Sequence, residues 1–221
     1  MLSVWWAAPE DARPEHDDLL SAEERTRRAR LLSVRGRKRS TVAYALSRIV
    51  LARELDADPA ELRIERVCAH CGGRHGKPRV VGADVRFSIA ASADRVAVAV
   101  TRGAEVGVDV EQVNPDLEVA ELTADVLSPA ERGASSPVGL LTYWTRKEAV
   151  LKATGDGLHV PLSDLTVSGP GEPPALLDWG GTSRRFQLYD LHPGAGYLAT
   201  LAVLGRTSSE VRELDGSPLL S

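Results

Sequence analysis

Hydrophobic and polar positions alternate in three consecutive segments near the middle of the chain. The segments are residues 85–90 (VRFSIA), 96–100 (VAVAV) and 106–111 (VGVDVE). Because successive side chains of a strand point to opposite faces, each segment predicts a strand with one apolar face. In the third segment, Asp109 and Glu111 occupy the face opposite the valines. We expect these strands to form an antiparallel meander with one buried face.

Capping residues and helical periodicity predict two helices before these strands. Ser21 and Glu24 have the spacing of a capping box, so a helix is expected to begin there. A second helix is predicted at about 38–55, where apolar residues recur at helical spacing. Residues 3–7 and 62–67 are expected to form short strands.

The second part of the chain carries the same kinds of signal. Ser128 and Glu131 form another capping box with a proline at the first helical position, and a longer helix is predicted from about Val138 to the glycines at 155–157. Strands are expected around residues 165–168, 184–191 and 197–204. The segment from Arg206 onward is polar and lacks periodicity, so we expect it to be loosely held.

These elements predict an α+β protein with two pseudo-symmetric halves. Each half is expected to contain a helix packed on a small, mostly antiparallel sheet. The expected halves are residues 1–103 and 104–205, followed by a flexible tail at 206–221. No sequence repeat supports the symmetry, which follows only from the order of the elements.

Composition excludes several classes of protein. The chain has 221 residues, 43% of them hydrophobic and 26% charged, which is typical of a folded protein and excludes disorder throughout. The apolar runs are far shorter than the roughly 20 residues of a membrane helix, and the N-terminus lacks the pattern of a secretory signal. We therefore expect a cytoplasmic protein with no membrane partner. Two cysteines exclude a disulfide scaffold.

Charge is unevenly distributed along the chain, although the net value is only −4. Ten basic residues and no acidic residue occur from Arg25 to Arg53, whereas eight acidic residues and no basic residue occur from Glu105 to Glu131. A basic run usually forms a solvated helix face. Nucleic-acid binding is disfavoured, because the chain is net acidic and aromatic residues are not interleaved with the arginines.

The acidic block contains a candidate metal site. Asp109 and Glu111 project from the same face of a predicted strand, about 7 Å apart, so their oxygens can converge on one hard cation. Glu148 on the later helix offers a third carboxylate, and Lys152 shares its helical face. Such a donor set suits Mg²⁺, which binds few protein oxygens and keeps places for water and phosphate. The alternative is that the Asp-Val-Glu stretch is the solvated face of an edge strand.

Four motifs occur in an ordered set. They are GKP at 76–78, FSIAAS at 87–92, VGVDVE at 106–111 and WTRKEAVLK at 144–152. Together they resemble the large, monomeric, Sfp-type 4′-phosphopantetheinyl transferases over residues 21–168. The resemblance implies the fold of that family and an Mg²⁺-dependent transferase of the holo-carrier-protein synthase type. Its co-substrate would be coenzyme A, whose phosphopantetheine arm moves to a serine of an acyl or peptidyl carrier protein, releasing adenosine 3′,5′-bisphosphate.

The resemblance also implies catalytic and metal-binding roles. Asp109, Glu111 and Glu148 would hold Mg²⁺ against the pyrophosphate of coenzyme A, and Asp109 counts among the coenzyme A contacts as well. Glu148, or a metal-held water, would take the proton from the serine. Lys152 would neutralise the bridging and leaving oxygens and thus contacts the cofactor too. Glu131 matches a further carboxylate near the metal, which would assist as a ligand or base.

The phosphates of coenzyme A provide a ligand for part of the basic block. By the same resemblance, Arg39 and Ser40 would contact these phosphates, and Lys77 of GKP would lie beside the nucleotide. Arg27 is a weaker candidate. Lys147 of the WTRKEA motif is also assigned to the cofactor contacts. We expect the other arginines of the basic block to form a solvated helix face.

One strand departs from the family pattern. The family sequence is F-N-x-S-H-S, whose serine and histidine contact the 3′-phosphate of coenzyme A, but these two positions hold Ala90 and Ala91 here. Ser88 replaces the asparagine, and Ser92 is kept. Losing a charge-assisted hydrogen bond costs about 1.5–3 kcal/mol. Compensation by an arginine, a relaxed preference for the 3′-phosphate and reduced activity are three possible explanations.

Two rival functions and several details stay open. The alanines motivate a coenzyme A or carrier-protein binding module without turnover, and an unrelated Mg²⁺ phosphohydrolase is the other rival. The carrier proteins could serve fatty acid, polyketide or nonribosomal peptide biosynthesis. The sequence does not distinguish Mn²⁺ from Mg²⁺, or tell whether acyl-coenzyme A or dephospho-coenzyme A is accepted.

Residues 68–75 read C-A-H-C-G-G-R-H, a cluster of zinc-type ligands formed by Cys68, His70, Cys71 and His75. The spacing is more compressed than in a four-ligand zinc finger, which joins two well-separated pairs. We favour a structural loop that leads into GKP. Metal binding and a redox disulfide are the alternatives.

Overall fold

The structure is a computed structural model that describes residues 2–131, 134, 136–205 and 210–221. Its helices are α1 (His16–Leu19), α2 (Ala22–Ala29), α3 (Val34–Leu55), α4 (Val119–Val126) and α5 (Pro137–Thr154). Its strands are β1 (Leu2–Ala7), β2 (Ile64–Glu65), β3 (Arg79–Val80), β4 (Val85–Ser92), β5 (Arg95–Arg102), β6 (Val106–Gln112), β7 (Leu165–Val167), β8 (Leu176–Trp179), β9 (Phe186–Asp190), β10 (Tyr197–Leu204) and β11 (Val211–Asp215). Short 3₁₀ turns are η1 (Pro9–Asp11), η2 (Gly157–His159), η3 (Leu162–Asp164) and η4 (Ser217–Leu219).

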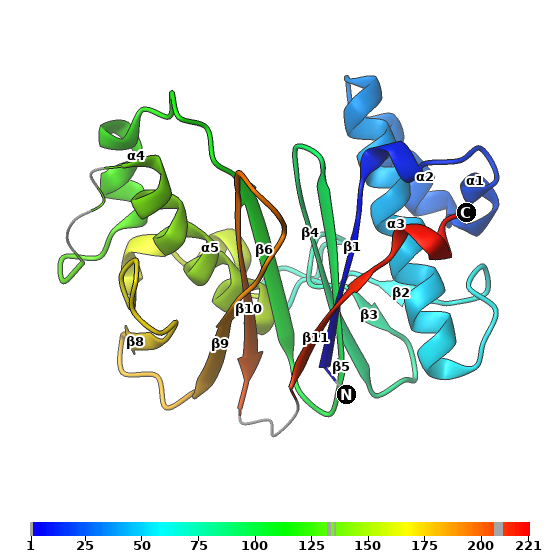
Figure 1. Ribbon diagram of the computed structural model, residues 1–221. Helices are drawn as coiled ribbons and strands as arrows, with labels where there is room; N and C mark the ends of the chain where they lie inside the picture. Colours follow the sequence, from blue (N-terminus) through cyan, green and yellow to red (C-terminus); the bar gives the residue numbers. More distant parts are fainter. Residues whose placement is uncertain (1, 132–133, 135, 206–209) are drawn as a thin grey trace.

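Two halves lie side by side, and in each a long helix, α3 or α5, packs on a small sheet (Figure 1). The strand order is β11-β1-β5-β4 in the first sheet and β6-β10-β9 in the second. Apart from the parallel pair of β1 and β11, the neighbours in these sheets are antiparallel. The predicted α+β fold with small, mostly antiparallel sheets is therefore confirmed.

Capping residues set the starts of the helices in the N-terminal half. The Ser21 hydroxyl accepts a hydrogen bond from the Glu24 N–H, and the Glu24 carboxylate accepts one from the Ser21 N–H, which confirms the predicted capping box. Helix α3 begins at Val34, before the predicted start, because Ser33 caps it by accepting a hydrogen bond from Gly36 N–H at 3.0 Å. The helix then packs on the apolar face of β4 and β5.

The C-terminal segment completes the N-terminal sheet, so the expectation of a flexible tail at 206–221 is wrong for the described residues. Strand β11 pairs in parallel with β1, with Val211 beside Leu2 and Asp215 beside Trp6. Leu220 is buried in the core under α3. The pattern missed this strand because five residues at a sheet edge carry too little periodicity to predict an element. Residues 206–209 lie outside the described part of the chain.

In the C-terminal half, α5 packs against β6 and β10, and the contact with β6 requires a glycine. A Cβ at Gly107 would lie 2.0 Å from the Ala149 carbonyl oxygen and 2.3 Å from the Ala153 nitrogen. Helix α5 ends at Gly155, whose φ of 85° is the left-handed conformation expected of a glycine cap. Strands β7, β9 and β10 confirm the strands predicted for this half.

The two sheets meet where β4 lies next to β6, and this arrangement corrects the predicted three-stranded meander. Strands β4 and β5 pair as predicted, but β6 pairs with β10. The Ser88 hydroxyl accepts a hydrogen bond from Val108 N–H, and the Ser92 hydroxyl accepts one from Gln112 N–H, both at 3.1 Å. Serine side chains therefore link the halves where a continuous backbone ladder would have linked a meander.

The second capping box forms a turn and does not start a helix. The Glu131 carboxylate accepts a hydrogen bond from Ser128 N–H at 2.8 Å, and the Glu131 N–H donates to the Ser128 carbonyl at 3.0 Å. The next helix among the described residues is α5, which begins at Pro137. Ser136 caps it by accepting a hydrogen bond from Gly139 N–H at 3.1 Å.

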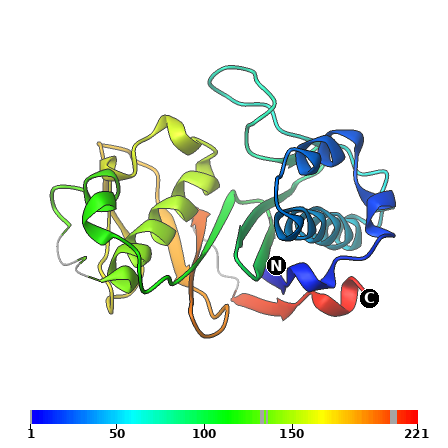
Figure 2. The same ribbon diagram turned by 90° about the horizontal axis from the view of Figure 1, so that it is seen from above.

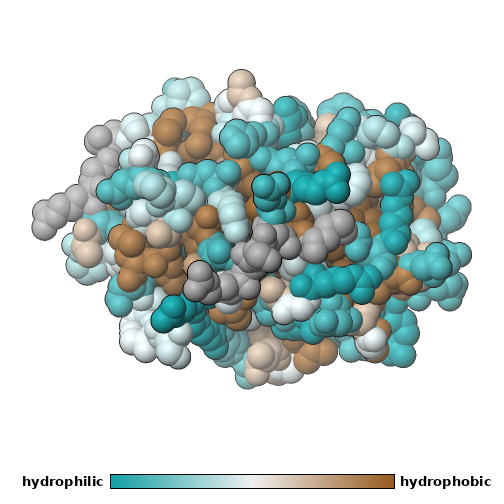
Figure 3. Space-filling view, turned by 60° about the horizontal axis from the view of Figure 1, so that its bottom comes forward, coloured by the Kyte–Doolittle hydropathy of each residue, from teal (hydrophilic) through white to brown (hydrophobic). Residues whose placement is uncertain are grey.

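The surface carries scattered apolar side chains. Figure 3 shows a face on which hydrophilic residues separate several apolar patches. Large exposed hydrophobic residues include Leu32, Val67 and Leu177, which come from three different segments. Among the described residues, no helix combines the length and apolar character that a membrane span requires.

Candidate active site

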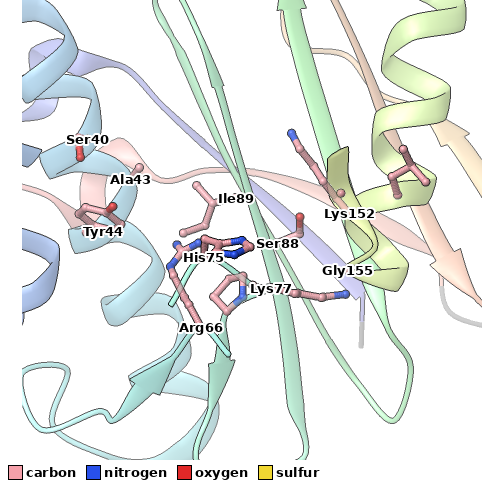
Figure 4. Close-up of a pocket in the computed structure, with 14 residues that line it drawn as sticks. Ser40, Ala43, Tyr44, Arg66, His75, Lys77, Ser88, Ile89, Lys152 and Gly155 are labelled. Atoms are coloured by element: carbon pink, nitrogen blue, oxygen red, sulfur yellow. The ribbon is translucent and has the colours of Figure 1, made fainter. Parts of the chain in front are cut away.

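A cavity of about 350 Å³ lies between the two halves (Figure 4). One wall comes from α3, and the opposite wall comes from the C-terminal end of α5. The lining residues are Ser40, Ala43, Tyr44, Arg66, His75, Gly76, Lys77, Pro78, Ser88, Ile89, Leu151, Lys152, Gly155 and Gly157. The cavity therefore brings together the segments of the GKP, FSIAAS and WTRKEAVLK motifs.

Asp109 on β6 and Lys152 on α5 form an ion pair beside this cavity. The Lys152 Nζ donates to Asp109 Oδ1 at 2.5 Å. The Lys152 side chain is 31% exposed and that of Asp109 is 5% exposed, so one side of the pair is open to solvent. Asp109 Oδ2 is buried and has no hydrogen-bond partner among the described residues. Burial raises the pKa of Asp109 to about 7 against the opposing effect of Lys152, and the charges of Glu111 and Glu148 raise it further.

Glu148 and Glu111 complete the acidic cluster. Glu148 is half-buried on α5, one turn before Lys152. Burial raises the pKa of Glu148, Lys152 opposes this shift, and Glu111 adds to it. Glu111 Oε2 accepts a hydrogen bond from the Ser92 hydroxyl at 2.7 Å. A carboxylate with a raised pKa is a more effective general base near neutral pH, which suits the role expected for Glu148.

The acidic cluster fits a divalent cation. Repulsion from neighbouring carboxylates adds to the raised pKa of Asp109 and of Glu148, and the single ammonium of Lys152 only opposes these shifts. The Oδ2 atom of Asp109 is a buried acceptor without a partner in the described chain. A cation that prefers oxygen ligands, such as Mg²⁺, would satisfy this atom and offset the repulsion. Asp109, Glu111 and Glu148 are the residues that would hold it.

Glu131 and Lys147 form a separate ion pair, and neither lines the cavity. Their side chains are 2% and 0% exposed. The Lys147 ammonium contacts Glu131 Oε2 and donates to the Val126 carbonyl at 2.6 Å. Glu131 Oε1 accepts a hydrogen bond from Val167 N–H at 2.7 Å. This position corrects the expected roles of ligand or base for Glu131 and of cofactor contact for Lys147, because both charged groups are enclosed by the protein.

Lys77 lines the cavity with its stem, whereas its ammonium points elsewhere. The Nζ atom donates to the carbonyls of Val106 at 2.8 Å and Ala153 at 2.6 Å, and pairs with Glu105 at 2.8 Å. Burial lowers the pKa of Lys77 to about 8, although Glu105 opposes the shift. The expected place of Lys77 beside the nucleotide stays a prediction, since its stem lines the cavity while its ammonium is held by protein groups. Lys77 fastens the GKP segment to β6 and α5.

The predicted phosphate contacts on α3 and α2 differ in position. Ser40 lines the cavity and Arg39 does not. Arg39 Nη1 donates to the Ala93 carbonyl, in the turn between β4 and β5, at 3.4 Å. Arg27 pairs with Glu23 at 2.8 Å on its own helix. The phosphate-contact role of Arg39 stays a prediction, and Arg27 lies outside the cavity wall.

Arg66 and Tyr44 line the cavity, and sequence reasoning missed both. The Arg66 guanidinium makes no hydrogen bond or ion pair with the described part of the chain. Burial lowers the pKa of Arg66, but a guanidinium remains protonated. Arg66 thus brings to the cavity a cation that is not ion-paired within the described chain, and such a cation suits a phosphate. Arg66 belongs to no motif and lies at the end of a weak strand pattern, so no sequence signal pointed to it.

The two alanines of FSIAAS occupy different environments. Ala90 is 4% exposed and belongs to the apolar cluster that includes Val106 and Val108. Its side chain is part of the core, which corrects its assignment as a cofactor contact. Ala91 is exposed, on the face of β4 opposite to Ala90. Of these two positions, Ala91 is the one at which a longer side chain could meet a ligand.

Comparisons with known proteins agree with this arrangement. A sequence profile of the 4′-phosphopantetheinyl transferase superfamily matches residues 105–202, which contain the acidic cluster and α5. A Synechocystis sp. protein provisionally named as a 4′-phosphopantetheinyl transferase is 30% identical over 172 residues, covering 72% of this chain and 68% of the relative. The 4′-phosphopantetheinyl transferase HetI of Nostoc sp. is 27% identical over 216 residues, covering 90% and 86% respectively.

The fold, the shared motifs and these similarities define the class of protein. It is a transferase of mixed α+β architecture with its candidate active site between two halves. The chain belongs to the 4′-phosphopantetheinyl transferase superfamily.

Proposed function

We propose that this transferase moves the 4′-phosphopantetheine arm of coenzyme A to a serine of an apo acyl or peptidyl carrier protein. The observation that carries the proposal is the cluster of Asp109, Glu111, Glu148 and Lys152 beside a cavity shared by the family motifs. In the reaction, the serine oxygen bonds to the β-phosphorus of coenzyme A, and the bond from that phosphorus to the bridging oxygen breaks. The products are the holo carrier protein and adenosine 3′,5′-bisphosphate.

The chain's own residues supply proton transfer and charge neutralisation. Glu148, with its raised pKa, accepts the proton of the serine hydroxyl. Lys152, partly exposed and already beside the carboxylates, offers its remaining N–H groups to the leaving oxygen. Such positioning and electrostatic stabilisation account for most of the catalysis in phosphoryl transfer.

We propose Mg²⁺ as the cation, held by Asp109, Glu111 and Glu148. When bound, it would offset the negative charge of the pyrophosphate. Ser40 and Arg66 face the cavity, where they would bind phosphate groups of coenzyme A, and Tyr44 would pack against the nucleotide. The cavity volume of about 350 Å³ lies within the range of small-molecule sites, about 300–1,000 Å³.

The protein partner in this proposal is a carrier domain. An acidic helix after the target serine would suit the basic surface of residues 25–39, since opposite potentials favour encounter. The experiment incubates the protein with coenzyme A, Mg²⁺ and an apo carrier protein, and then weighs the carrier by mass spectrometry. A mass gain of one phosphopantetheine arm supports the transferase.

Other outcomes of that experiment identify the rival functions. Binding without a mass gain would support a binding module, the rival motivated by Ala90 and Ala91. Breakdown of coenzyme A without carrier would support a phosphohydrolase. A matched reaction with the Glu148→Gln variant separates enzymatic transfer from transfer by a contaminant, because that variant should leave the carrier in its apo form.

A further inference from the structure

The loop of residues 66–76, here called the Cys/His loop, gathers metal-binding side chains outside the acidic cluster. The ligand atoms of Cys68, Cys71 and His75 all lie within 4.8 Å of one another. Cys71 Sγ and His75 Nε2 are 3.1 Å apart. Both cysteines are free thiols. Thiolate and imidazole are the preferred ligands of zinc in proteins.

His159, from the other half of the molecule, is a candidate for a fourth ligand, because its ring reaches one of these three side chains. His159 lies in η2, just after the catalytic helix α5, and its Nε2 atom is 3.8 Å from Cys68 Sγ. Figure 2 shows the Cys/His loop extending from the N-terminal half toward the C-terminal half. A tetrahedral zinc ion, with bonds of about 2.3 Å to sulfur and about 2.0 Å to nitrogen, holds a sulfur and a nitrogen about 3.5 Å apart. The two observed sulfur–nitrogen distances lie on either side of this value.

The backbone of the loop is shaped to present both sulfurs on one side. Gly72 N–H donates to the Cys68 carbonyl at 2.9 Å, and Cys68 N–H donates to the Gly73 carbonyl at 2.8 Å. Gly72 adopts a φ of 72°, which only glycine adopts readily, directly after Cys71.

Hydrophobic packing does not explain why the loop holds this shape. From residue 66 to residue 76, the buried residues are Cys68 and Gly76, and Val67 is 61% exposed. A segment with so little apolar burial needs another source of stability, and a structural metal is a common one in small folds. The same loop ends in His75 and Gly76, which line the cavity.

We propose that Cys68, Cys71, His75 and His159 form a structural zinc site that ties the Cys/His loop to the segment after α5. Four protein ligands leave no open position, so the ion acts as a clamp and takes no part in the chemistry. The zinc ion would hold two cavity-lining segments in place: the residues that precede GKP and the residues Gly155–Gly157. It is separate from the acidic cluster, whose oxygen donors suit a harder cation.

His70 is the main competitor for the fourth position. Its ring lies 4.3 Å from the ring of His159, measured between centroids, and its Nε2 is 3.4 Å from Asp156 Oδ1. The assignment favours His159, because His159 Nε2 is the imidazole nitrogen that lies beside Cys68 Sγ. His70 and Asp156 would instead form a neighbouring pair.

The test measures metal binding by the full chain, reduced and stripped with a chelator, in the absence of coenzyme A and carrier. We expect one Zn²⁺ per chain, and Co²⁺ in its place should give the intense visible absorption of a tetrahedral ion together with thiolate charge-transfer bands. Cys71→Ser and His159→Gln should each weaken Zn²⁺ binding by more than about 100-fold, since even neighbouring-shell changes cost about 10–100-fold. His70→Gln and the distant His192→Gln should keep one ion per chain and the cobalt spectrum.

Several results would overturn the site. They are no uptake of Zn²⁺ by the reduced chain, a cobalt spectrum without thiolate bands, or unchanged affinity in Cys71→Ser or His159→Gln. Loss of Zn²⁺ binding in His70→Gln but not in His159→Gln would contradict the assignment of His159 as the fourth ligand. As a second readout, trypsin should cut after Arg66 or Arg74 faster in the metal-free chain than in the zinc-loaded chain, and equal rates would contradict a clamp. None of these measurements depends on phosphopantetheine transfer, so the zinc site and the proposed function fail independently.

Discussion

Helix α5 carries two lysines, Lys147 and Lys152, and each pairs with a carboxylate from another segment in a different way. Lys147 and Glu131 are fully enclosed, and both Glu131 oxygens accept hydrogen bonds. Lys152 is 31% exposed, and its partner Asp109 keeps one buried oxygen without a partner among the described residues. The charged groups of the enclosed pair are already occupied by protein partners. In the open pair, the Lys152 ammonium keeps N–H groups that can bind a ligand, and Asp109 Oδ2 can still accept a bond.

Helical geometry explains how one helix carries both an enclosed ion pair and an open one. The two lysines are five positions apart, a rotation of about 140° in a helix with about 3.6 residues per turn. One therefore points toward α4 and the 128–131 turn, and the other points toward β6 and the cavity. An enclosed charge and a charge available to a ligand can thus lie within two turns of each other without contact. Charge type and motif membership do not distinguish them, but the hydrogen-bond inventory of each carboxylate does.

The largest effect is expected when the enclosed pair is broken. Glu131→Gln removes the counter-charge of Lys147 and leaves a buried ammonium unpaired, which should lower the free energy of unfolding by about 3–5 kcal/mol. Urea denaturation measures this change. Asp125→Asn, at an exposed position on α4, serves as the control and should change the value by less than about 0.5 kcal/mol. A loss below about 1 kcal/mol for Glu131→Gln would contradict the structural role.

Glu148, which lies beside the open pair in the acidic cluster, should affect activity and not stability. Glu148→Gln removes the proposed base while keeping the shape of the side chain, and we expect kcat of carrier modification to fall by about 10²–10³-fold. The free energy of unfolding should not decrease, because the change also removes repulsion between Glu148 and Glu111. Steady-state kinetics and urea denaturation of the same preparation test the two statements. A parallel loss of both quantities would mean that Glu148 belongs with the enclosed pair.

Sequence patterns predicted the elements that are long and periodic, such as α3, α5, β4, β5 and β10. They did not predict which strands pair. The apolar alternation of β6 is the same whether it joins β5 in a meander or β10 in a second sheet. In the structure β6 pairs with β10 and meets β4 through the Ser88 and Ser92 side chains. Strand β11 was missed because an edge strand of five residues owes its conformation to its partner β1.

The candidate site was partly predictable for a related reason. The motifs pointed to Asp109, Glu111, Glu148 and Lys152, which the fold brings together. Motifs mark residue types, however, and do not reveal whether a charge is neutralised inside the protein, as for Lys147 and Lys77. Arg66 presents the opposite case, since its importance comes from an unneutralised charge beside the cavity and from no motif.

A smaller effect is expected at Arg66, which lines the cavity and is proposed to bind a phosphate of coenzyme A. Arg66→Gln removes a charge-assisted bond to phosphate worth about 1.5–3 kcal/mol, so KM for coenzyme A should rise by about 10- to 100-fold while kcat changes little. Arg53→Gln, outside the cavity, is the matched control. A fall in kcat with unchanged KM would show that Arg66 does not bind the ground-state cofactor.

Ala91 allows a related test of specificity. The ratio of KM for dephospho-coenzyme A to KM for coenzyme A should be closer to one in the natural chain than in Ala91→His, because an imidazole at this exposed position can donate to the 3′-phosphate. The expected change in the ratio is about tenfold, because one charge-assisted hydrogen bond contributes about 1.5 kcal/mol at the lower end of its range. Equal ratios in the two proteins would exclude position 91 from phosphate recognition.

The smallest expected effect concerns the pH dependence of stability, and it distinguishes the two pairs without any substrate. Burial raises the pKa of Asp109 from 3.8 to about 7, so the folded chain binds a proton more tightly than the unfolded chain does. This contribution to stability is complete below pH 3.8 and is lost as the pH rises through about 7.

In metal-free protein, Asp109→Asn removes the titration, and the melting temperature of the variant minus that of the natural chain should increase between pH 5 and pH 8. An increase of a few degrees is expected, since 1 kcal/mol corresponds to about 2–4 °C for a chain of this size. Parallel melting curves would mean that Lys152 neutralises Asp109 as completely as Lys147 neutralises Glu131, and the open pair would then lack the unbalanced charge on which the proposed metal site rests.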